Sequence, residues 1–222
     1  MYGRRYGDKE LRFEASGGLL NSSLVMQDME TDTFWSLMKG MAVHGELAGT
    51  KLQELPGAEK VLWKDWVKKH PDTLVLSVGG VEDPGTDPYA RYWSDPRGFR
   101  GQTAADGRLP TKEPIYAFER AGEHNAVPHT TLVGGRSFVL ADGRAAFLYR
   151  EEGSHLFAST AAFLDSGGGF ALVKGAWTDL GTGARFDASK RAFPSAQVPA
   201  LGGFDTYWYT WSLTNPRTRI LR

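Results

Sequence analysis

Four side chains near the start of the chain could orient a polar ligand. Asn21 and Ser22 supply an amide and a hydroxyl, Asp28 supplies a carboxylate, and Trp35 adds a large ring with one N–H donor. The same groups often bond to nearby backbone at turns and strand ends, so a purely structural role is the competing interpretation. We predict a ligand-binding role for these four residues.

A charged pair further along the chain could add acid–base chemistry. Lys112 and Glu113 are adjacent, and burial or a neighbouring charge can tune the pKa of either group. They could act as an acid–base pair or as a clamp for an anion, whereas a surface ion pair is the more common use of such neighbours. We include both residues in the predicted ligand-binding set and assign no catalytic residue.

Most familiar catalytic and cofactor patterns are missing from the sequence. Cysteine is absent, which excludes disulfides, thiolate zinc sites and cysteine nucleophiles in this chain. The five histidines show neither His-x-His nor His-Glu-x-x-His spacing. The glycine-flanked serine of hydrolases and the glycine patterns of phosphate-binding and dinucleotide-binding loops do not occur either. We therefore predict no cofactor and no metal.

Charge and hydropathy limit the classes of partner. Twenty-six basic residues balance twenty-six acidic residues, so the chain lacks the positive surface expected of a nucleic-acid binder. No apolar stretch has the length of a transmembrane segment, and the first residues are polar, unlike a signal peptide. We expect a chain that is soluble as given, with an unknown protein or small-molecule partner. The oligomeric state stays open, and an extracytoplasmic location would need a signal ahead of this sequence.

The segments that must position these side chains contain motifs that occur twice in the sequence. A Trp-x-x-Trp motif, followed by Pro, Thr and two aliphatic residues at identical spacing, occupies 63–76 and recurs at 208–221. Upstream of each copy, an Asp-x-x-Thr pattern followed by an aromatic residue occupies 28–35 and recurs at 179–186. We infer a duplicated unit. The predicted copies are residues 11–78 and 155–222, and the connecting region is 79–154.

Each copy predicts the same order of elements: a hairpin, a connecting segment, a short helix and a strand. Asp32 and Gly183 are placed to close matching hairpin turns at positive φ. Pro71 and Pro216 end the two helices, because proline disfavours helical geometry in the residue before it. The β-branched, alternating pattern of 72–78 predicts a strand after the first helix.

Aromatic pairs and a long loop complete the predicted architecture. Trp63 and Trp66 form one pair, and Trp208 and Trp211 form the other. We predict that each pair packs on the sheet of its own copy, so only an exposed pair would indicate a binding surface. Residues 83–110 are rich in Pro, Gly, Asp and Arg and predict a long loop.

Several stretches of the chain share motifs with one known family. They are 13–35, 40–49, 63–76, 112–113 and 126–128, and the first ends in Asp28-x-x-Thr31-x-x-x-Trp35. Together they resemble the prokaryotic domain of unknown function 3179 (DUF3179) family. The resemblance covers nearly the whole chain and implies no established reaction. Members of that family usually carry a cysteine-containing stretch just upstream of the first strand, so the resemblance implies no thiol-dependent redox or metal role for this cysteine-free chain.

The pattern as a whole predicts a single compact domain over residues 1–222. Its fold class is β-rich α+β, built from two pseudo-repeated antiparallel β units that each carry a short helix. Duplicated halves commonly meet at a groove, which we expect to be lined by Asn21, Asp28 and Trp35 and approached by the 83–110 loop.

Two functional hypotheses fit this architecture. The leading one is a non-catalytic ligand-recognition or assembly module, which predicts an exposed aromatic or apolar patch and no cluster of titratable groups with shifted pKa values. The alternative is a hydrolase or metal-assisted enzyme with its site in the groove between the repeats. It requires at least two ionisable side chains that converge in one pocket.

Overall fold

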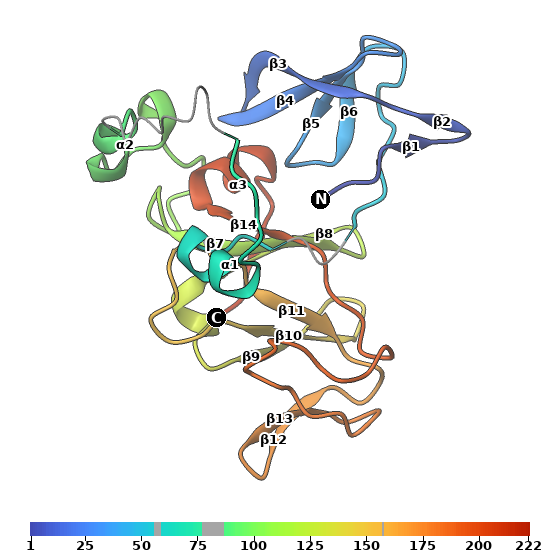
Figure 1. Ribbon diagram of the computed structural model, residues 1–222, viewed down its shortest axis with the longest axis vertical. Helices are drawn as coiled ribbons and strands as arrows, with labels where there is room; N and C mark the ends of the chain where they lie inside the picture. Colours follow the sequence, from blue (N-terminus) through green and yellow to red (C-terminus); the bar gives the residue numbers. More distant parts are fainter. Residues whose placement is uncertain (56–58, 77–86, 157) are drawn as a thin grey trace.

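The computed structural model describes residues 1–55, 59–76, 87–156 and 158–222 and shows small sheets joined by loops and short helices (Figure 1). The strands are β1 Arg5–Tyr6, β2 Lys9–Glu10, β3 Phe13–Leu20, β4 Ser23–Asp28, β5 Phe34–Ser36, β6 Met41–His44, β7 Pro114–Arg120, β8 Glu123–Pro128, β9 Arg136–Val139, β10 Ala145–Tyr149, β11 Ala161–Leu164, β12 Phe170–Val173, β13 Ala176–Asp179, β14 Phe204–Tyr207 and β15 Arg219–Ile220. The helices are α1 Trp63–Lys69, α2 Ala90–Ser94 and α3 Trp208–Thr214, with 3-10 helices at Phe99–Gly101 and His129–Leu132. The predicted β-rich character with few helices is confirmed. Within the described ranges, no helix has the length and apolar character needed to cross a membrane.

The first sheet is a four-stranded antiparallel layer in the order β3-β4-β5-β6. Trp35 on β5 and Ala42 on β6 are opposite each other in the register and pack with Leu11 in a small core of their own. The hairpin between β4 and β5 turns at residues 29–33, where Asp32 has a φ of 53°. This confirms the predicted hairpin and its positive-φ residue.

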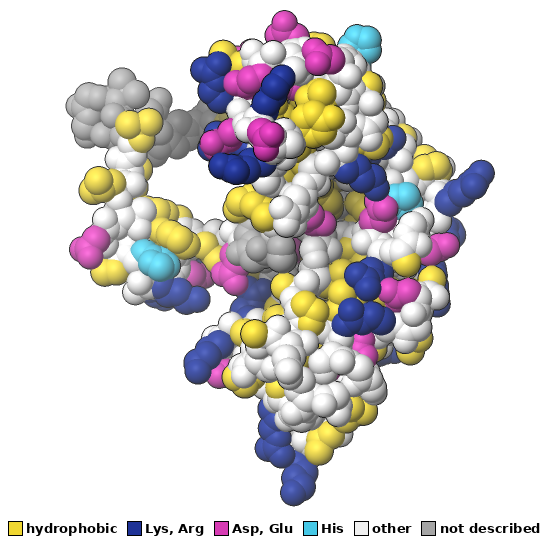
Figure 2. Space-filling model, turned by 90° about the vertical axis from the view of Figure 1, so that its right-hand side faces the viewer, with side chains coloured by type: hydrophobic (Ala, Val, Ile, Leu, Met, Phe, Trp, Pro, Cys, Tyr) yellow, Lys and Arg dark blue, Asp and Glu magenta, His cyan; other side chains and the backbone are white. Residues whose placement is uncertain are grey.

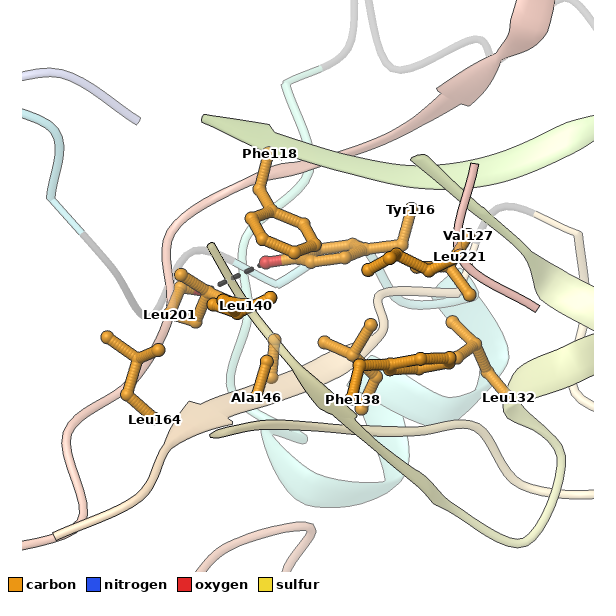
Figure 3. Close-up of a cluster of buried hydrophobic side chains, with 12 residues drawn as sticks. Tyr116, Phe118, Val127, Leu132, Phe138, Leu140, Ala146, Leu164, Leu201 and Leu221 are labelled. Atoms are coloured by element: carbon orange, nitrogen blue, oxygen red, sulfur yellow. Dashed lines mark hydrogen bonds between the residues drawn. The ribbon is translucent and has the colours of Figure 1, made fainter. Parts of the chain in front are cut away.

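The second half is a stack of layers that begins at α3. The sheet β14-β7-β8-β15 lies next to α3, and the sheet β11-β10-β9 lies on its other side. Successive side chains of β7 point to opposite faces of the sheet. Both faces are covered, so β7 is buried on each side. Ile115 and Ala117 face α3, whereas Tyr116 and Phe118 face the core between the two sheets (Figure 3). The hydroxyl of Tyr116 donates to the Leu201 carbonyl at 2.7 Å inside that core.

The two hairpin turns that the sequence pairs have the same hydrogen bonds. Asp28 accepts from the Thr31 backbone N–H at 2.7 Å and from its hydroxyl at 2.9 Å. Asp179 accepts from the Thr182 backbone N–H at 2.9 Å and from its hydroxyl at 2.6 Å. Gly183, the counterpart of Asp32, also has positive φ. The Asp-x-x-Thr pattern is therefore a turn motif in which the carboxylate satisfies the loop backbone.

The paired helices also have matching local geometry. After α1, His70 has φ −133° and ψ 68°, and after α3, Asn215 has φ −131° and ψ 73°. In both places the threonine three residues on, Thr73 or Thr218, donates back to that residue's carbonyl. Proline stands between them in each copy and prevents the helix from continuing. The similarity is established for these segments, while the superposition of two complete units stays a prediction.

Burial separates the two helices. Trp208 and Trp211 are 0% and 2% exposed, which confirms the predicted core role of this pair. Trp63 and Trp66 are 54% and 39% exposed, so the prediction that this pair packs on a sheet is wrong. The reason is that no described strand lies against α1, whereas α3 lies against β7 and β8.

Two further expectations are corrected by the structure. The stretch from 87 to 110 is not a continuous loop, because it contains α2 and a 3-10 helix, while 83–86 lie outside the described residues. Residues 72–76 form no strand, and 77–78 lie outside the described residues, so the predicted strand after α1 is not observed where it can be assessed. The single-domain organisation stays a prediction.

Replacing Asp28 with Ala tests the turn motif. The change leaves the buried Trp35 N–H and the Thr31 N–H without their acceptor, so we expect a loss of about 2 kcal/mol in the free energy of unfolding. Chemical denaturation followed by circular dichroism measures the loss. The control is Asp8→Ala at an exposed position, which should change stability by less than about 0.5 kcal/mol. Equal stability of the two variants would contradict the structural role.

Candidate functional site

The predicted residues Asp28 and Trp35 lie together inside the first sheet. The indole Nε1 of Trp35 donates to Asp28 Oδ2 at 2.7 Å, and both side chains are buried. Burial by itself raises the pKa of Asp28, but the hydrogen bonds from Trp35 and Thr31 outweigh it and hold that pKa below its ordinary value. Both residues are therefore engaged with each other and with the turn.

Asn21 and Ser22 form the two-residue turn between β3 and β4. Their φ values of 51° and 61° fit the turn type that matches the twist of a hairpin. The Asn21 amide donates to the Leu213 carbonyl at 3.2 Å and to the Thr214 hydroxyl at 3.3 Å. Asn21 thus connects the first sheet to the end of α3.

Lys112 and Glu113 lie in a third place, beside α2. Lys112 Nζ donates to the carbonyls of Tyr92 and Asp95 at 2.5 and 2.9 Å and lies 4.2 Å from the centre of the Tyr92 ring. The carbonyl of Glu113 accepts from the Trp208 N–H at 2.9 Å. The structure therefore does not bring the six predicted residues into one groove, and none of them lines the three cavities described below. Their ligand-binding role stays a prediction.

The largest of these cavities lies between the first sheet and α3. Its volume is about 550 Å³. One wall comes from the turn into β6, with Met38 and Met41, and the opposite wall comes from Phe204 and Trp211. A cavity of this size with apolar walls is typical of a small-molecule site. Its position between the two halves is where a groove was expected, although other residues line it.

Two buried donors on this cavity have no acceptor. Trp211 Nε1 and Asn215 Nδ2 make no hydrogen bond with any part of the chain that the structure describes, and their residues are 2% and 6% exposed. In the matching helix, the equivalent indole of Trp66 donates to Thr73 at 2.9 Å. A buried N–H without a partner costs about 1–3 kcal/mol. The second copy therefore carries this cost in two residues that line the cavity.

Charged side chains of both signs line the cavity. Lys51 is paired with Glu119 at 3.2 Å. Lys39 and Arg217 also line the cavity, but neither side chain has an ion pair or hydrogen bond among the described residues. Figure 2 shows the mixture of basic, acidic and apolar side chains on this side of the molecule. Glu54 also lines the cavity, and burial raises the pKa of its carboxyl group above the ordinary value.

A second polar cluster surrounds Asp205 on β14. Its carboxylate accepts from the Thr160 hydroxyl at 2.6 Å, from the Thr160 N–H at 2.9 Å and from Arg150 at 3.3 Å. His129 Nε2 lies 2.9 Å from Asp205 Oδ1. Lys60 Nζ donates to the Asp205 carbonyl at 2.7 Å. Burial by itself raises the pKa of Asp205, but His129 and Thr160 outweigh it and hold that pKa below its ordinary value.

This cluster borders two smaller cavities. One of about 340 Å³ is lined by Lys60, Thr160, Arg191 and Asp205, and another of about 160 Å³ is lined by Lys60, His129 and Asp205. Ionisable side chains thus converge in one place, as the enzymatic alternative requires. Burial lowers the pKa of Lys60 below its ordinary value. Among the described residues, no group of three or more His, Asp or Glu side chains is arranged to hold a metal ion.

Sequence reasoning missed the residues of the largest cavity and those of the Asp205 cluster, for a physical reason. Trp211 belongs to the duplicated motif and was interpreted as core, and Asn215 directly precedes Pro216, which was interpreted as the end of the helix. Lys60, Arg150 and Asp205 are far apart in sequence and carry no motif. One signal was present: Asn215 replaces His70 between the two copies, and a polar change inside a buried segment marks a place where the copies differ in role.

Comparison with known proteins places the chain in a family. Residues 1–218 of the 222-residue chain match a family described as "Protein of unknown function (DUF3179)". A search of curated proteins and a search of solved structures found no match. The family match confirms the resemblance carried by the sequence motifs and extends over both halves of the fold. The protein therefore belongs to the DUF3179 family.

Proposed function

We propose that this protein is a recognition module that binds a small organic acid in the cavity between the first sheet and α3. The observation that carries the proposal is the pair of unpartnered buried donors, Trp211 Nε1 and Asn215 Nδ2, in two residues that line the cavity. An acceptor group of the ligand would satisfy them. The function is binding, because no nucleophile with an activating base lines this cavity among the described residues.

Charge and shape define the ligand class. Lys39 and Arg217 supply two positive charges without partners, which favours a carboxylate at the mouth of the cavity. Phe204 and Trp211 provide aromatic walls for an apolar or aromatic body. A volume of about 550 Å³ lies in the range that encloses a small molecule. The expected ligand is an aromatic or branched aliphatic acid.

A matched ligand panel tests the proposal. We expect phenylacetate and indole-3-acetate to raise the melting temperature in a thermal-shift assay, whereas the corresponding neutral amides do not, because the cationic rim recognises the carboxylate. A ligand at about one hundred times its Kd stabilises the fold by about 2.7 kcal/mol, which such an assay detects. Equal shifts from acids and amides, or no shift from any acid, would count against the proposed ligand class.

Variants distinguish the contribution of the two cationic residues, Lys39 and Arg217, from that of the aromatic wall residue Trp211. Lys39→Met and Arg217→Met should each weaken binding about tenfold or more, because a hydrogen bond to a charged group contributes about 1.5–3 kcal/mol. Trp211→Phe keeps an aromatic wall but removes the N–H, so we expect a threefold to tenfold loss, about 0.5–1.5 kcal/mol. Isothermal titration calorimetry measures the Kd values. Lys9→Met and Trp66→Phe are the controls away from the cavity and should bind as the parent does.

The enzymatic alternative is supported by a different observation. Lys60, His129 and Asp205 converge on the 160 Å³ cavity, and such convergence is common at catalytic sites. The Asp205 carboxylate, however, is already held by Thr160 and Arg150, which favours a structural role. Metal analysis by inductively coupled plasma mass spectrometry on protein purified without chelator separates the candidates. Stoichiometric metal would favour the metal-assisted enzyme.

A further inference from the structure

The duplicated helix–proline–threonine segment is covered in one copy and bare in the other. In the covered copy, Trp208 and Trp211 of α3 pack on a hairpin formed by β7 and β8. The hairpin presents small apolar side chains toward the helix: Ile115, Ala117 and Ala126. Both indoles lose nearly all exposure in this contact.

The strand that follows α3 completes this packing. β15 pairs with β8 in parallel, with Ile220 opposite Ala126, and the Leu221 N–H donates to the Ala126 carbonyl at 2.9 Å. Leu221 then enters the core between the two sheets, where it is 5% exposed. The segment 208–221 thus contacts the β7–β8 hairpin in two ways: α3 packs on its face, and β15 pairs with its edge strand β8.

The segment 63–76 has the same local geometry with neither contact. Trp63 and Trp66 are exposed, and Leu76, the counterpart of Leu221, is 98% exposed. Among the described residues, every hydrogen bond made by 61–76 joins two residues of that same segment. Lys60 connects this segment to the body: its carbonyl accepts from the Ser159 N–H at 3.1 Å, and its N–H donates to the Ser159 hydroxyl at 2.5 Å. Figure 2 shows this α1 segment on the left, standing off the body with hydrophobic side chains gathered on it.

The sequence of α1 is that of a helix covered on one side. Its tryptophan face matches α3, whereas the other face carries Lys64, Lys68 and Lys69. At the equivalent positions, α3 has Tyr, Leu and Thr, because α3 is enclosed on nearly all sides. A helix that keeps the indoles while its opposite face becomes charged is typical of a surface helix with one apolar partner.

We propose that α1 and residues 73–76 form a docking surface for a β-hairpin of another polypeptide. The partner hairpin presents small apolar residues at alternate positions to Trp63 and Trp66, and its edge strand pairs in parallel with 73–76. The basic outer face of α1 favours acidic residues beside the hairpin. The occupant is not the β7–β8 hairpin of a second intact copy, because α3 and β15 already cover that hairpin. This inference is independent of the ligand cavity.

Hydrogen–deuterium exchange with a hairpin probe tests the proposal. The probe is a synthetic peptide with the sequence of residues 112–130, which contains β7 and β8, added in large excess to the intact protein. We expect the amides of 63–76 to exchange at least tenfold more slowly with the peptide, because helix and strand hydrogen bonds become protected. A peptide with Ala117→Asp and Ala126→Asp should give no protection, since both changes place charge against the indoles.

Protein variants identify the surface. Trp63→Ser combined with Trp66→Ser should abolish the protection, whereas Lys64→Ser combined with Lys68→Ser on the opposite face should retain it. Failure of the parent peptide to protect 63–76 would overturn the proposal. Protection of 63–76 that grows with protein concentration in the absence of peptide would also overturn it, because a second copy would then be the occupant.

Discussion

Asp205→Asn lowers the free energy of unfolding by about 3–5 kcal/mol, because it removes one charge from a buried group of opposite charges. The side chain is 7% exposed and accepts from Thr160 and Arg150. Asparagine keeps the shape but leaves the Arg150 guanidinium, itself 4% exposed, without its anion. Because Asp205 lies on β14, Arg150 directly after β10 and Thr160 directly before β11, the loss affects the packing of both sheets.

Urea denaturation followed by tryptophan fluorescence measures this loss. The matched control is Asp187→Asn, at a carboxylate that is 37% exposed and bonds within its own turn. We expect the control to lose much less, because solvent screens exposed ion pairs. A loss at Asp205 no larger than at Asp187 would show that the buried cluster is not what holds the sheets together.

The effect of Asp205→Asn should depend on pH with a defined sign. The folded-state pKa of Asp205 lies below its ordinary value, which is about 3.9 in an unfolded chain. Its ionised form therefore stabilises the fold at pH values above about 4, and that stabilisation is lost as the pH falls through the lowered pKa. The stability difference between parent and Asp205→Asn should be largest near neutral pH and shrink in acid.

The two tryptophan motifs should respond very differently to the same substitution. Trp208→Ala removes a ring that is 0% exposed and packed on β7 and β8, so we expect a loss of about 3–5 kcal/mol. Trp63→Ala removes a ring that is 54% exposed, and such surface changes stay within about 0.5 kcal/mol. The pair is its own control, because sequence motif and helix position are the same.

Chemical denaturation of both variants measures this contrast. Trp208 also donates from its Nε1 to the Asp106 carbonyl at 2.7 Å, and loss of that bond adds to the cavity left by the ring. A loss at Trp63 equal to that at Trp208 would mean that α1 is covered in solution by part of the same chain. That result would also contradict the docking surface proposed for α1.

Local geometry was predictable from the sequence because short-range interactions determine it. The Asp28 and Asp179 turns follow from a carboxylate and a hydroxyl at fixed distance along the chain, and both turns form as the pattern predicts. The ends of α1 and α3 follow from Pro71 and Pro216 in the same way. The absence of cysteine and the balanced charge were equally direct, since they need only the composition.

The candidate site was not predictable in its residues, because its members are brought together by layers that no local pattern specifies. Met38 and Trp211 are more than one hundred and seventy positions apart, about the length of a typical domain, yet they line one cavity. Asp28 and Trp35 attracted attention as a polar pair, but they satisfy each other inside the first sheet. A buried polar side chain indicates a binding role when it has no hydrogen-bond partner within the protein, and only the three-dimensional structure shows whether a partner is present.

The sequence by itself determined the β-rich class, the two matching turns and the two matching helices. The tertiary structure alone decided which copy of the Trp-x-x-Trp motif is covered, because burial depends on whether a sheet surface lies within reach of the helix. α3 has β7 and β8 beside it, and α1 has no described strand beside it. Identical motifs therefore became a core element in one place and an exposed aromatic surface in the other.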